Sequence, residues 1–171
     1  MKNLKTIICD YQDFPKKGII FKDLLPILST PNIFNQLINN MVISKISKDA
    51  DAILAIDARG FIFGSAMAYA SSKPMIVARK PGKLPGNLIE KTYSLEYGSN
   101  SLSIQKESVK DFRKILIVDD LLATGGTISC VIDILESLEK EITGISVVAE
   151  LKDLDARSKI NHCIDFSAFK L

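Results

Sequence analysis

Short apolar runs alternate with stretches of helical periodicity along this chain of 171 residues. Apolar side chains recur at helical spacing over 33–46, and small or apolar residues fill 60–70 and 125–138, so these three stretches predict helices. Continuous apolar runs typical of buried strands lie at 52–57, 74–79, 114–120 and 142–151. Because strands and helices alternate, the pattern predicts an α/β fold with a mostly parallel sheet flanked by helices.

The region between Lys80 and Val109 breaks this alternation. Glycines and prolines cluster at 81–86, and the segments KTYSLEYG and SLSIQ then alternate weakly between apolar and polar positions. These two segments can pair as a hairpin that turns around 98–100. Because long irregular insertions inside compact domains are often functional, we expect either a decoration of the fold or a lid over a site.

Composition adds mainly exclusions. The length fits one domain, and 47% hydrophobic residues with 25% charged residues are ordinary for a globular protein. A net charge of +2 without a long basic run gives no reason to expect a nucleic-acid partner. The longest uncharged run, 24–44, contains two prolines and several asparagines, so it predicts a loop and an amphipathic helix and no membrane span.

The cysteine and histidine residues bear on the cellular compartment and on possible disulfides and metal sites. Three widely spaced cysteines without a CxxC pair argue against a disulfide framework or a zinc site and favour a reducing compartment. A single histidine excludes a His-based metal cluster. No signal peptide is apparent at the N-terminus, so the sequence predicts a cytoplasmic protein.

The stretch ILIVDDLLATGGTI, residues 115–128, carries the most specific chemistry. In a parallel sheet, ligands bind at the carboxyl ends of the strands, which is where Asp119 and Asp120 would stand. A glycine-rich turn then opens a helix, and such a turn offers backbone amides and a helix N-terminus to a phosphate. The residues expected at the phosphate are Ala123, Thr124, Gly125, Gly126 and Thr127.

Two adjacent carboxylates would be repelled by a nearby phosphate unless groups between the carboxylates and the phosphate donate hydrogen bonds. Vicinal sugar hydroxyls are such donors, and a divalent cation is another possible partner, so a ribose 5-phosphate satisfies both halves of the motif. An aspartate helix cap followed by a plain loop is the competing interpretation. The motif is not a Walker A loop, since no Gly-Lys-Ser/Thr follows, and the chain contains no GxG of a dinucleotide fingerprint.

The stretch resembles the phosphoribosyl pyrophosphate signature of the type I phosphoribosyltransferases. From about Asp13 to Leu151 the chain is similar to the adenine-specific members of that family, through the segments DFPKKGIIFKDLLPIL, DARGFIFG, RKPGKLPG, YSLEYG and VDDLLATGGT. The resemblance implies one domain over 1–171 with the type I phosphoribosyltransferase fold. It also implies a small N-terminal hood at about 1–30 and a flexible β-hairpin flap at about 80–108.

The same resemblance implies the reaction and its partners. The protein would transfer the 5-phosphoribosyl group from phosphoribosyl pyrophosphate to adenine, giving AMP and pyrophosphate in purine salvage. Mg²⁺ would be bound mainly through the phosphoribosyl pyrophosphate, with no dedicated metal ligands in the protein. The family forms homodimers, so a homodimer is expected here. The groups expected to act in the reaction are Arg59, Glu96, Asp119 and Asp120.

Pyrophosphate, the leaving group, needs cations. Arg59 lies in the predicted strand-to-helix turn of DARGF, where the family binds pyrophosphate, often through a strained peptide bond before the residue that is Ala58 here. Relatives usually carry serine at that position. Three further cations, each of which taken alone is equally compatible with ordinary solvation, follow the next predicted strand as Arg79, Lys80 and Lys83.

The base site is expected from GIIFKD. Phe21 would stack on the purine and Leu121 would form the facing wall, while backbone groups of Ile20 and Lys22 would read the base. Most relatives have arginine in place of Lys22, which leaves the backbone contacts possible. For Phe21 alone, core packing is the competing interpretation.

The segment YSLEYG supplies the two remaining candidates. Glu96 would exchange a proton with the purine when the flap closes, and Tyr97 would orient the flap or touch a phosphate. A solvated hairpin charge is the competing interpretation of Glu96.

Two other functions remain open on the sequence alone. One is a phosphoribosyltransferase for xanthine, hypoxanthine, guanine or orotate, against which the SLEYG and GIIF segments argue. The other is a non-catalytic nucleotide sensor, but such regulators usually carry an added DNA-binding domain, for which 171 residues leave no room.

Overall fold

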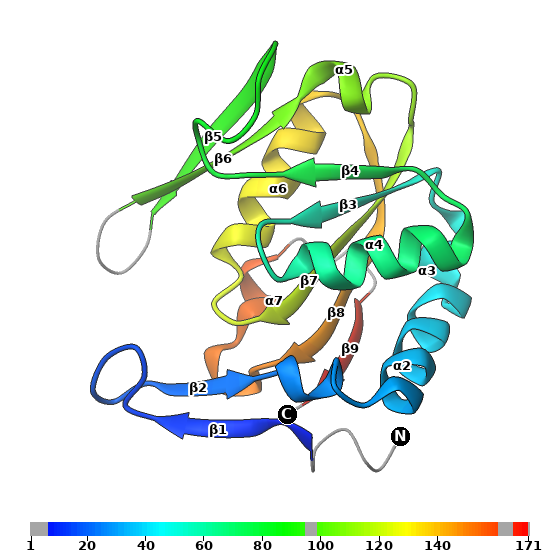
Figure 1. Cartoon of the computed structure of the whole chain (residues 1–171). Helices are drawn as coiled ribbons and strands as arrows, with labels where there is room; N and C mark the ends of the chain where they lie inside the picture. Colours follow the sequence, from blue (N-terminus) through cyan, green and yellow to red (C-terminus); the bar gives the residue numbers. More distant parts are fainter. Residues whose placement is uncertain (1–6, 95–98, 161–165, 171) are drawn as a thin grey trace.

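The computed structural model describes residues 7–94, 99–160 and 166–170. Its centre is a five-stranded sheet in the order β4-β3-β7-β8-β9, and every pairing within it is parallel (Figure 1). The predicted α/β class with a mostly parallel sheet is therefore confirmed. The strands are β3 (Ala52–Ile56), β4 (Met75–Ala78), β7 (Lys114–Leu122), β8 (Glu141–Glu150) and β9 (Phe166–Lys170).

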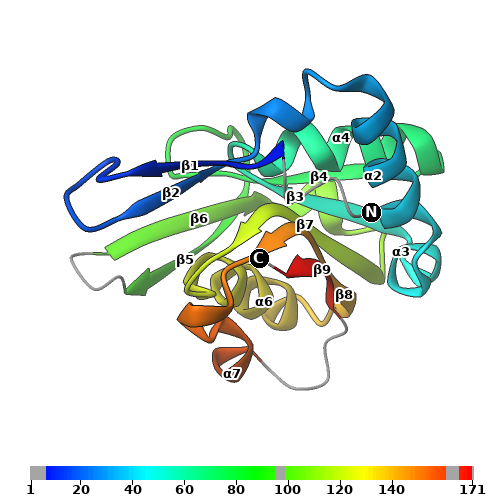
Figure 2. The same cartoon turned by 90° about the horizontal axis from the view of Figure 1, so that it is seen from below.

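Helices cover both faces of this sheet (Figure 2). Ile53 of β3 and Leu116 of β7 pack with α2, α3 and α4 in one apolar cluster, whereas Leu54 and Ile117 pack with α6 in another. Neighbouring residues of a strand point to opposite faces, so a strand covered on both faces must be apolar throughout, as the sequence shows. The helices are α2 (Pro31–Ile43), α3 (Lys45–Asp49), α4 (Gly60–Ser71), α5 (Lys106–Val109), α6 (Gly126–Ser137) and α7 (Ala156–Lys159), with 3₁₀ turns η1 (Leu25–Ile27) and η2 (Lys152–Leu154).

The helix predicted over 33–46 is divided in two. Ser44 has an extended backbone, with φ −60° and ψ 149°, and therefore ends α2. Its hydroxyl accepts a hydrogen bond from the backbone N–H of Ser47, so the same residue caps the start of α3. Serine competes for backbone groups in this way, which apolar periodicity alone does not register.

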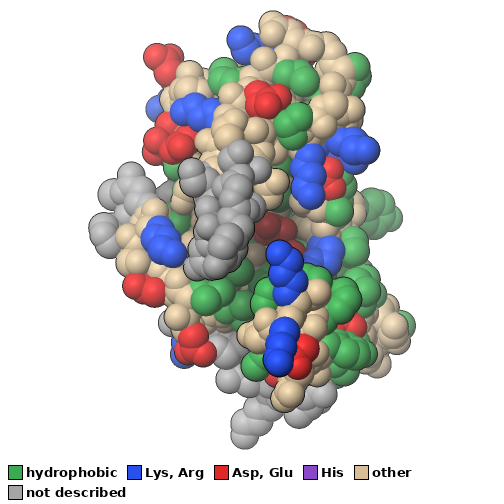
Figure 3. Space-filling view, turned by 90° about the vertical axis from the view of Figure 1, so that its left-hand side faces the viewer, with side chains coloured by type: hydrophobic (Ala, Val, Ile, Leu, Met, Phe, Trp, Pro, Cys, Tyr) green, Lys and Arg blue, Asp and Glu red, His purple; other side chains and the backbone are tan. Residues whose placement is uncertain are grey.

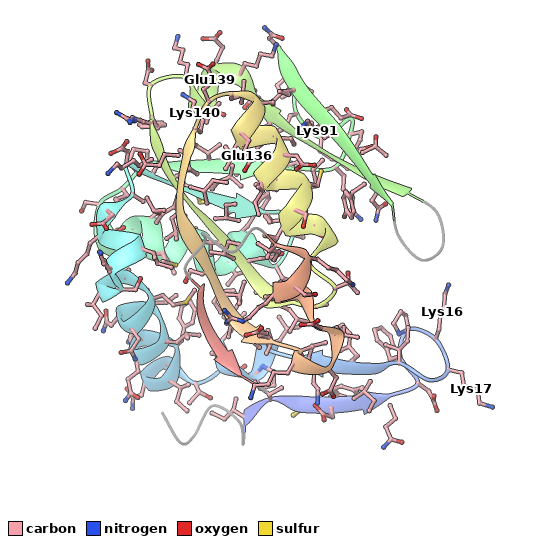
Figure 4. The ribbon with its side chains drawn as sticks, turned by 180° about the vertical axis from the view of Figure 1, so that it is seen from behind. Lys16, Lys17, Lys91, Glu136, Glu139 and Lys140 are labelled. Carbon is pink, nitrogen blue, oxygen red and sulfur yellow. The ribbon has the colours of Figure 1, made fainter. Side chains whose placement is uncertain are left out.

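Two antiparallel strand pairs stand outside the central sheet. Strands β1 (Cys9–Gln12) and β2 (Ile20–Asp23) form one pair, and Lys16 and Lys17 extend from the tip of the turn that joins them (Figure 4). Strands β5 (Leu88–Ser94) and β6 (Ser99–Gln105) form the other. The predicted hairpin pairing is confirmed, but Ser99 and Asn100, expected in its turn, are the first residues of β6.

Among the helices in the described part of the chain, none combines the length and the apolar character that a membrane crossing needs.

Candidate active site

The carboxyl ends of β3 and β7 mark the point where the sheet order reverses. From β3 the chain passes outward to β4, and from β7 it passes to β8 on the opposite side. Connections that leave two neighbouring strands in opposite directions open a crevice between them, which is where ligands bind in such sheets. The molecule is hollowed on the side shown in Figure 3, with acidic side chains deep inside and basic side chains around it.

Asp120 and Arg59 meet in this crevice. Asp120 is only 5% exposed, and its Oδ2 lies 2.8 Å from Nε of Arg59. The angles at this contact are not those of a hydrogen bond, so Oδ2 has an opposite charge beside it and no hydrogen-bond donor among the described residues. Removing a carboxylate from water without full hydrogen bonding is costly, so this oxygen is available to a ligand that brings donors.

The adjacent Asp119 is coupled to Asp120. Its Oδ1 accepts a hydrogen bond of 2.8 Å from the backbone N–H of Asp120. Burial, followed by the neighbouring charge of Asp120, raises the pKa of Asp119 well above its ordinary value. Burial also raises the pKa of Asp120, and the charge of Arg59 opposes that shift. The fold thus holds two carboxyl groups in an environment that disfavours their charges.

Gly60, the first residue of α4, explains how a helix comes so close to these acids. A Cβ built on Gly60 would lie 2.9 Å from Oδ1 of Asp119 and 3.1 Å from the carbonyl oxygen of Val118. Any other residue would push the helix away from β7. The peptide bond between Asp57 and Ala58, in the turn that leads into this helix, is cis.

The four predicted cations separate into two groups. Arg59 faces Asp120, and Arg79 pairs with Asp57 through Nε and Oδ2 at 2.9 Å. Both guanidinium groups are therefore held by carboxylates at the ends of the strands. Lys80 and Lys83 instead lie exposed in the loop that follows β4.

The predicted phosphate turn follows β7 and shares a cavity of about 70 Å³ with Asp119. Gly125 has φ +84°, a conformation that favours glycine, and it precedes the first turn of α6. A Cβ on Gly125 would meet the Cβ and the carbonyl oxygen of Ala156, each at 3.3 Å. The cavity is lined by Asp119, Leu121, Leu122, Ala123, Thr124, Gly125, Thr127 and Ile128.

The segment behind Gly125 is a part of the site that the sequence did not reveal. Glu150, 4% exposed, ends β8 and accepts two hydrogen bonds from Arg157, of 2.6 Å from Nε and 2.8 Å from Nη2. This pair holds α7 in place, so that Ala156 and Ile160 back the phosphate turn. An acid at the end of a buried strand with an arginine seven residues later is the only sequence signal for it.

The predicted base segment lies beside Arg59. The ring centroid of Phe21 is 5.2 Å from Cζ of Arg59, and the edge of Phe14 packs on that ring at 5.1 Å between centroids. The side chain of Lys22 pairs with Asp10 at 2.6 Å. A cavity of about 470 Å³ adjoins this strand, lined by Gly18, Ile19, Ile20, Lys22, Leu151, Lys152, Asp153 and Leu154.

Two candidates, Glu96 and Tyr97, lie outside the described residues. Within the residues that are described, no group of three or more His, Cys, Asp or Glu side chains is placed to hold a metal ion.

Residues 27–167 match the family model described as the phosphoribosyl transferase domain. The chain belongs to this family. The chain is 53% identical over 167 residues to the adenine phosphoribosyltransferase of Prochlorococcus marinus (strain MIT 9312), with 98% of each chain covered. The family-model match continues to residue 167, past the segments between Asp13 and Leu151 that carry the resemblance.

Solved structures give the same picture for this family member. It superposes with a TM-score of 0.91 on the adenine phosphoribosyltransferase of Rhodothermus marinus, at 29% identity and with 99% and 97% of the two chains covered. The TM-score is 0.89 with the Saccharomyces cerevisiae adenine phosphoribosyltransferase complexed with an imino-altritol bisphosphate and adenine, at 34% identity and 98% and 96% coverage. The predicted type I phosphoribosyltransferase fold is confirmed by these similarities.

Proposed function

We propose that this protein transfers the 5-phosphoribosyl group of phosphoribosyl pyrophosphate to adenine, giving AMP and pyrophosphate, and so serves purine salvage. The observation that carries this is the pair of acids, half-buried Asp119 and buried Asp120, beside a glycine-rich turn at the crevice between β3 and β7. A sugar phosphate is the ligand that uses both parts at once, the acids for its hydroxyls and the turn for its phosphate. The names of the relatives support adenine as the acceptor.

The 5-phosphate is assigned to the turn over Ala123–Thr127. Successive backbone N–H groups at the start of α6 provide partial positive charge, and the hydroxyls of Thr124 and Thr127 can donate to the same anion. The ribose hydroxyls are assigned to Asp119 and Asp120. Their donation would supply the hydrogen bond that Oδ2 of Asp120 lacks among the described residues.

Pyrophosphate is assigned to the end of β3. Arg59 stands next to Asp120 there, and the backbone amide of Ala58 is a further donor. Arg79, already held by Asp57, adds positive charge, and Lys80 and Lys83 extend from the loop after β4. A leaving group with several negative charges requires such a set of cations.

Magnesium fits this site as a companion of the substrate. Carboxylate oxygens are the donors that Mg²⁺ prefers, but the described residues offer only Asp119 and Asp120 near the turn and no cage of three ligands. The phosphoribosyl pyrophosphate would therefore provide most of the coordinating oxygens. When bound, the ion supplies neutralisation of the negative charge on the departing pyrophosphate.

Adenine is assigned to the space between Phe21 and Leu121. In an antiparallel pair, backbone groups of alternate residues point toward the partner strand and those between them point away. Ile20 and Lys22 are alternate residues of β2, so their backbone groups point the same way, which the proposal takes to be the open edge of the hairpin. An N–H and a C=O at that edge match the ring nitrogen and exocyclic amine of adenine.

The reaction is a substitution at the anomeric carbon. As the bond to pyrophosphate breaks, positive charge develops on the sugar, and the carboxylates of Asp119 and Asp120 favour it. Arg59 holds the departing oxygen, while the phosphate turn fixes the other end of the ribose. Glu96 is assigned the proton exchange with the purine, and Tyr97 a contact that orients the flap or a phosphate.

The proposal also covers the hood, the flap, the assembly, the location and the domain organisation. The segment at about 1–30 acts as a hood over the base, and the hairpin at about 80–108 acts as a flap that excludes water from the activated sugar. The protein works as a homodimer in the cytoplasm. Both regions belong to a single domain that spans 1–171.

A base-competition assay tests the function. Purified protein receives Mg²⁺, phosphoribosyl pyrophosphate and one base at a time. We expect adenine to exceed hypoxanthine and guanine in kcat/KM by at least about 100-fold, because a site that pairs with an amine leaves groups unpaired when offered a carbonyl. Comparable kcat/KM values for hypoxanthine or guanine would refute adenine specificity. The absence of transfer to any base would refute the proposed phosphoribosyltransferase activity.

A further inference from the structure

Strand β5 of the hairpin is tied to helix α6 by two side-chain contacts. The thiol of Cys130 donates to the carbonyl oxygen of Lys91 at 3.3 Å. Two residues further along the strand, Oη of Tyr93 lies 3.1 Å from Oγ1 of Thr127. The second contact falls at the start of α6, inside the phosphate turn. The hairpin therefore touches the turn directly, through one side chain.

The ring of Tyr93 also explains the glycine at position 126. A Cβ on Gly126 would lie 3.3 Å from Cδ2 and 3.6 Å from Cε2 of that ring. Unlike Gly125, Gly126 does not have a positive φ, so its backbone conformation does not demand glycine. The close approach of the tyrosine favours glycine here, because the ring would have to shift by a few tenths of an ångström to admit a Cβ. The ring is half-buried and packs on the apolar cluster around α6, which fixes its position.

A threonine hydroxyl carries one hydrogen, so it can donate only once, although it can also accept. If Tyr93 donates to Thr127, the hydrogen of Thr127 is left for a phosphate oxygen. We propose that Tyr93 is a positioning residue, whose ring seats Gly126 and whose hydroxyl orients Thr127 toward the 5-phosphate of the sugar. This inference rests on the proposed function, in which that phosphate occupies the turn.

The test variant is Tyr93→Phe, which keeps the ring and removes the hydroxyl. We expect ribose 5-phosphate to bind about three- to tenfold more weakly, the usual scale for one neutral hydrogen bond, with a matching rise in KM for phosphoribosyl pyrophosphate. KM for adenine and kcat at saturation should not change. The control is Thr92→Val, which removes a neighbouring hairpin hydroxyl that bonds Ser101 at 2.8 Å; it should behave as wild type.

A double-mutant cycle separates positioning from a general structural effect. In a Thr127→Ala background, Tyr93→Phe should cost no further affinity, because the residue it orients is gone. An additive loss, or wild-type affinity in Tyr93→Phe, would overturn the proposal.

Calorimetry with ribose 5-phosphate needs no turnover, so it separates this inference from the proposed function. A wild-type protein that binds ribose 5-phosphate but transfers no phosphoribosyl group from phosphoribosyl pyrophosphate to any base refutes only the proposed activity. A wild-type protein that does not bind ribose 5-phosphate overturns this inference.

Discussion

The turn at 123–127 and the hairpin of β1 and β2 are built in opposite ways, although Arg59 contacts both Phe21 of the hairpin and Asp120, which precedes the turn in β7. The turn is backed by α7 and by β5. The hairpin is a two-stranded sheet whose Phe14 and Ile20 are 54% and 52% exposed. The contrast predicts that the proposed phosphate site is formed before the ligand arrives and that the proposed base site is completed by the ligand.

Two glycines with nearly the same positive φ provide the strongest test of this contrast. Gly125 has φ +84° and is backed by Ala156, whereas Gly18 of the hairpin turn has φ +87° and nothing within 4 Å of its missing Cβ. Gly125→Val should lose more than about 100-fold in phosphoribosyl pyrophosphate affinity, and overpacking should cost about 1–3 kcal/mol beyond the backbone strain. Gly18→Val should lose only the stability that backbone strain costs, because nothing lies within 4 Å of its Cβ position. Calorimetry and chemical unfolding measure both, and equal losses would contradict the contrast.

The acid pair should show a conflict between stability and activity. Asp119→Asn keeps an oxygen for the N–H of Asp120 but removes a charge that burial disfavours. We expect affinity for phosphoribosyl pyrophosphate to fall about ten- to hundredfold. The free energy of unfolding at pH 7 should rise, because the folded state no longer buries that charge.

The pH dependence of that gain has a definite sign. The folded-state pKa of Asp119 lies above its unfolded value, so the wild type loses stability as pH rises through the interval between the two. The advantage of Asp119→Asn should therefore be absent below the unfolded pKa, grow across that interval and stay constant above it. Asp10→Asn, at an exposed pair in the hairpin, is the control and should change stability little. A variant less stable than wild type at pH 7 would refute the argument.

On the base side the expected effects are smaller and selective. Phe21→Leu should raise KM for adenine about tenfold, since stacking on an aromatic ring is worth roughly 1–3 kcal/mol. Binding of ribose 5-phosphate should be unchanged. Phe14→Leu, at the neighbouring ring, should have a weaker effect. Steady-state kinetics and calorimetry separate the two ligands, and a parallel loss of sugar-phosphate affinity would show that the two regions are not independent.

The smallest effect is expected at Lys22. Its ammonium group is engaged by Asp10, and the proposed reading of adenine uses only its backbone. Lys22→Met should therefore change KM for adenine by less than about threefold, in line with the small value of exposed ion pairs. A larger rise in KM, measured in the same assay, would mean that the side chain takes part in base recognition.

Features that depend on local pattern were predictable from the sequence. Continuous apolar runs located the strands of the central sheet that fall between 52 and 151, because a strand covered on both faces has no polar position to interrupt it. The turn between β7 and α6 was predictable because a glycine-rich stretch follows an apolar run and precedes a helical pattern. That it binds a phosphate stays a prediction. The order of the strands in the sheet was not predictable, because it depends on which apolar faces meet in the folded protein.

Features that depend on long-range contacts were not predictable. The pairing of Arg79 with Asp57 joins residues 22 positions apart, and nothing in either segment specifies it. Gly125 contacts Ala156, which lies far from it in the sequence. The sequence suggests that glycine is needed here so that a ligand can approach the backbone. The structure adds a second reason, because Ala156 leaves little room for a side chain. The division of the first predicted helix depends on one side-chain hydrogen bond of Ser44.

The pair of Glu150 and Arg157 bears on when the site comes into being during translation. The acids and the phosphate turn are synthesised more than 30 residues before Ile160, the last described residue that packs behind Gly125. A nascent chain that still holds this segment inside the ribosome has every candidate ligand-binding residue exposed and no surface for the turn to rest on. Binding competence is therefore expected only once this segment has been made and has packed, and premature termination before Arg157 should remove it without touching a proposed ligand-binding residue.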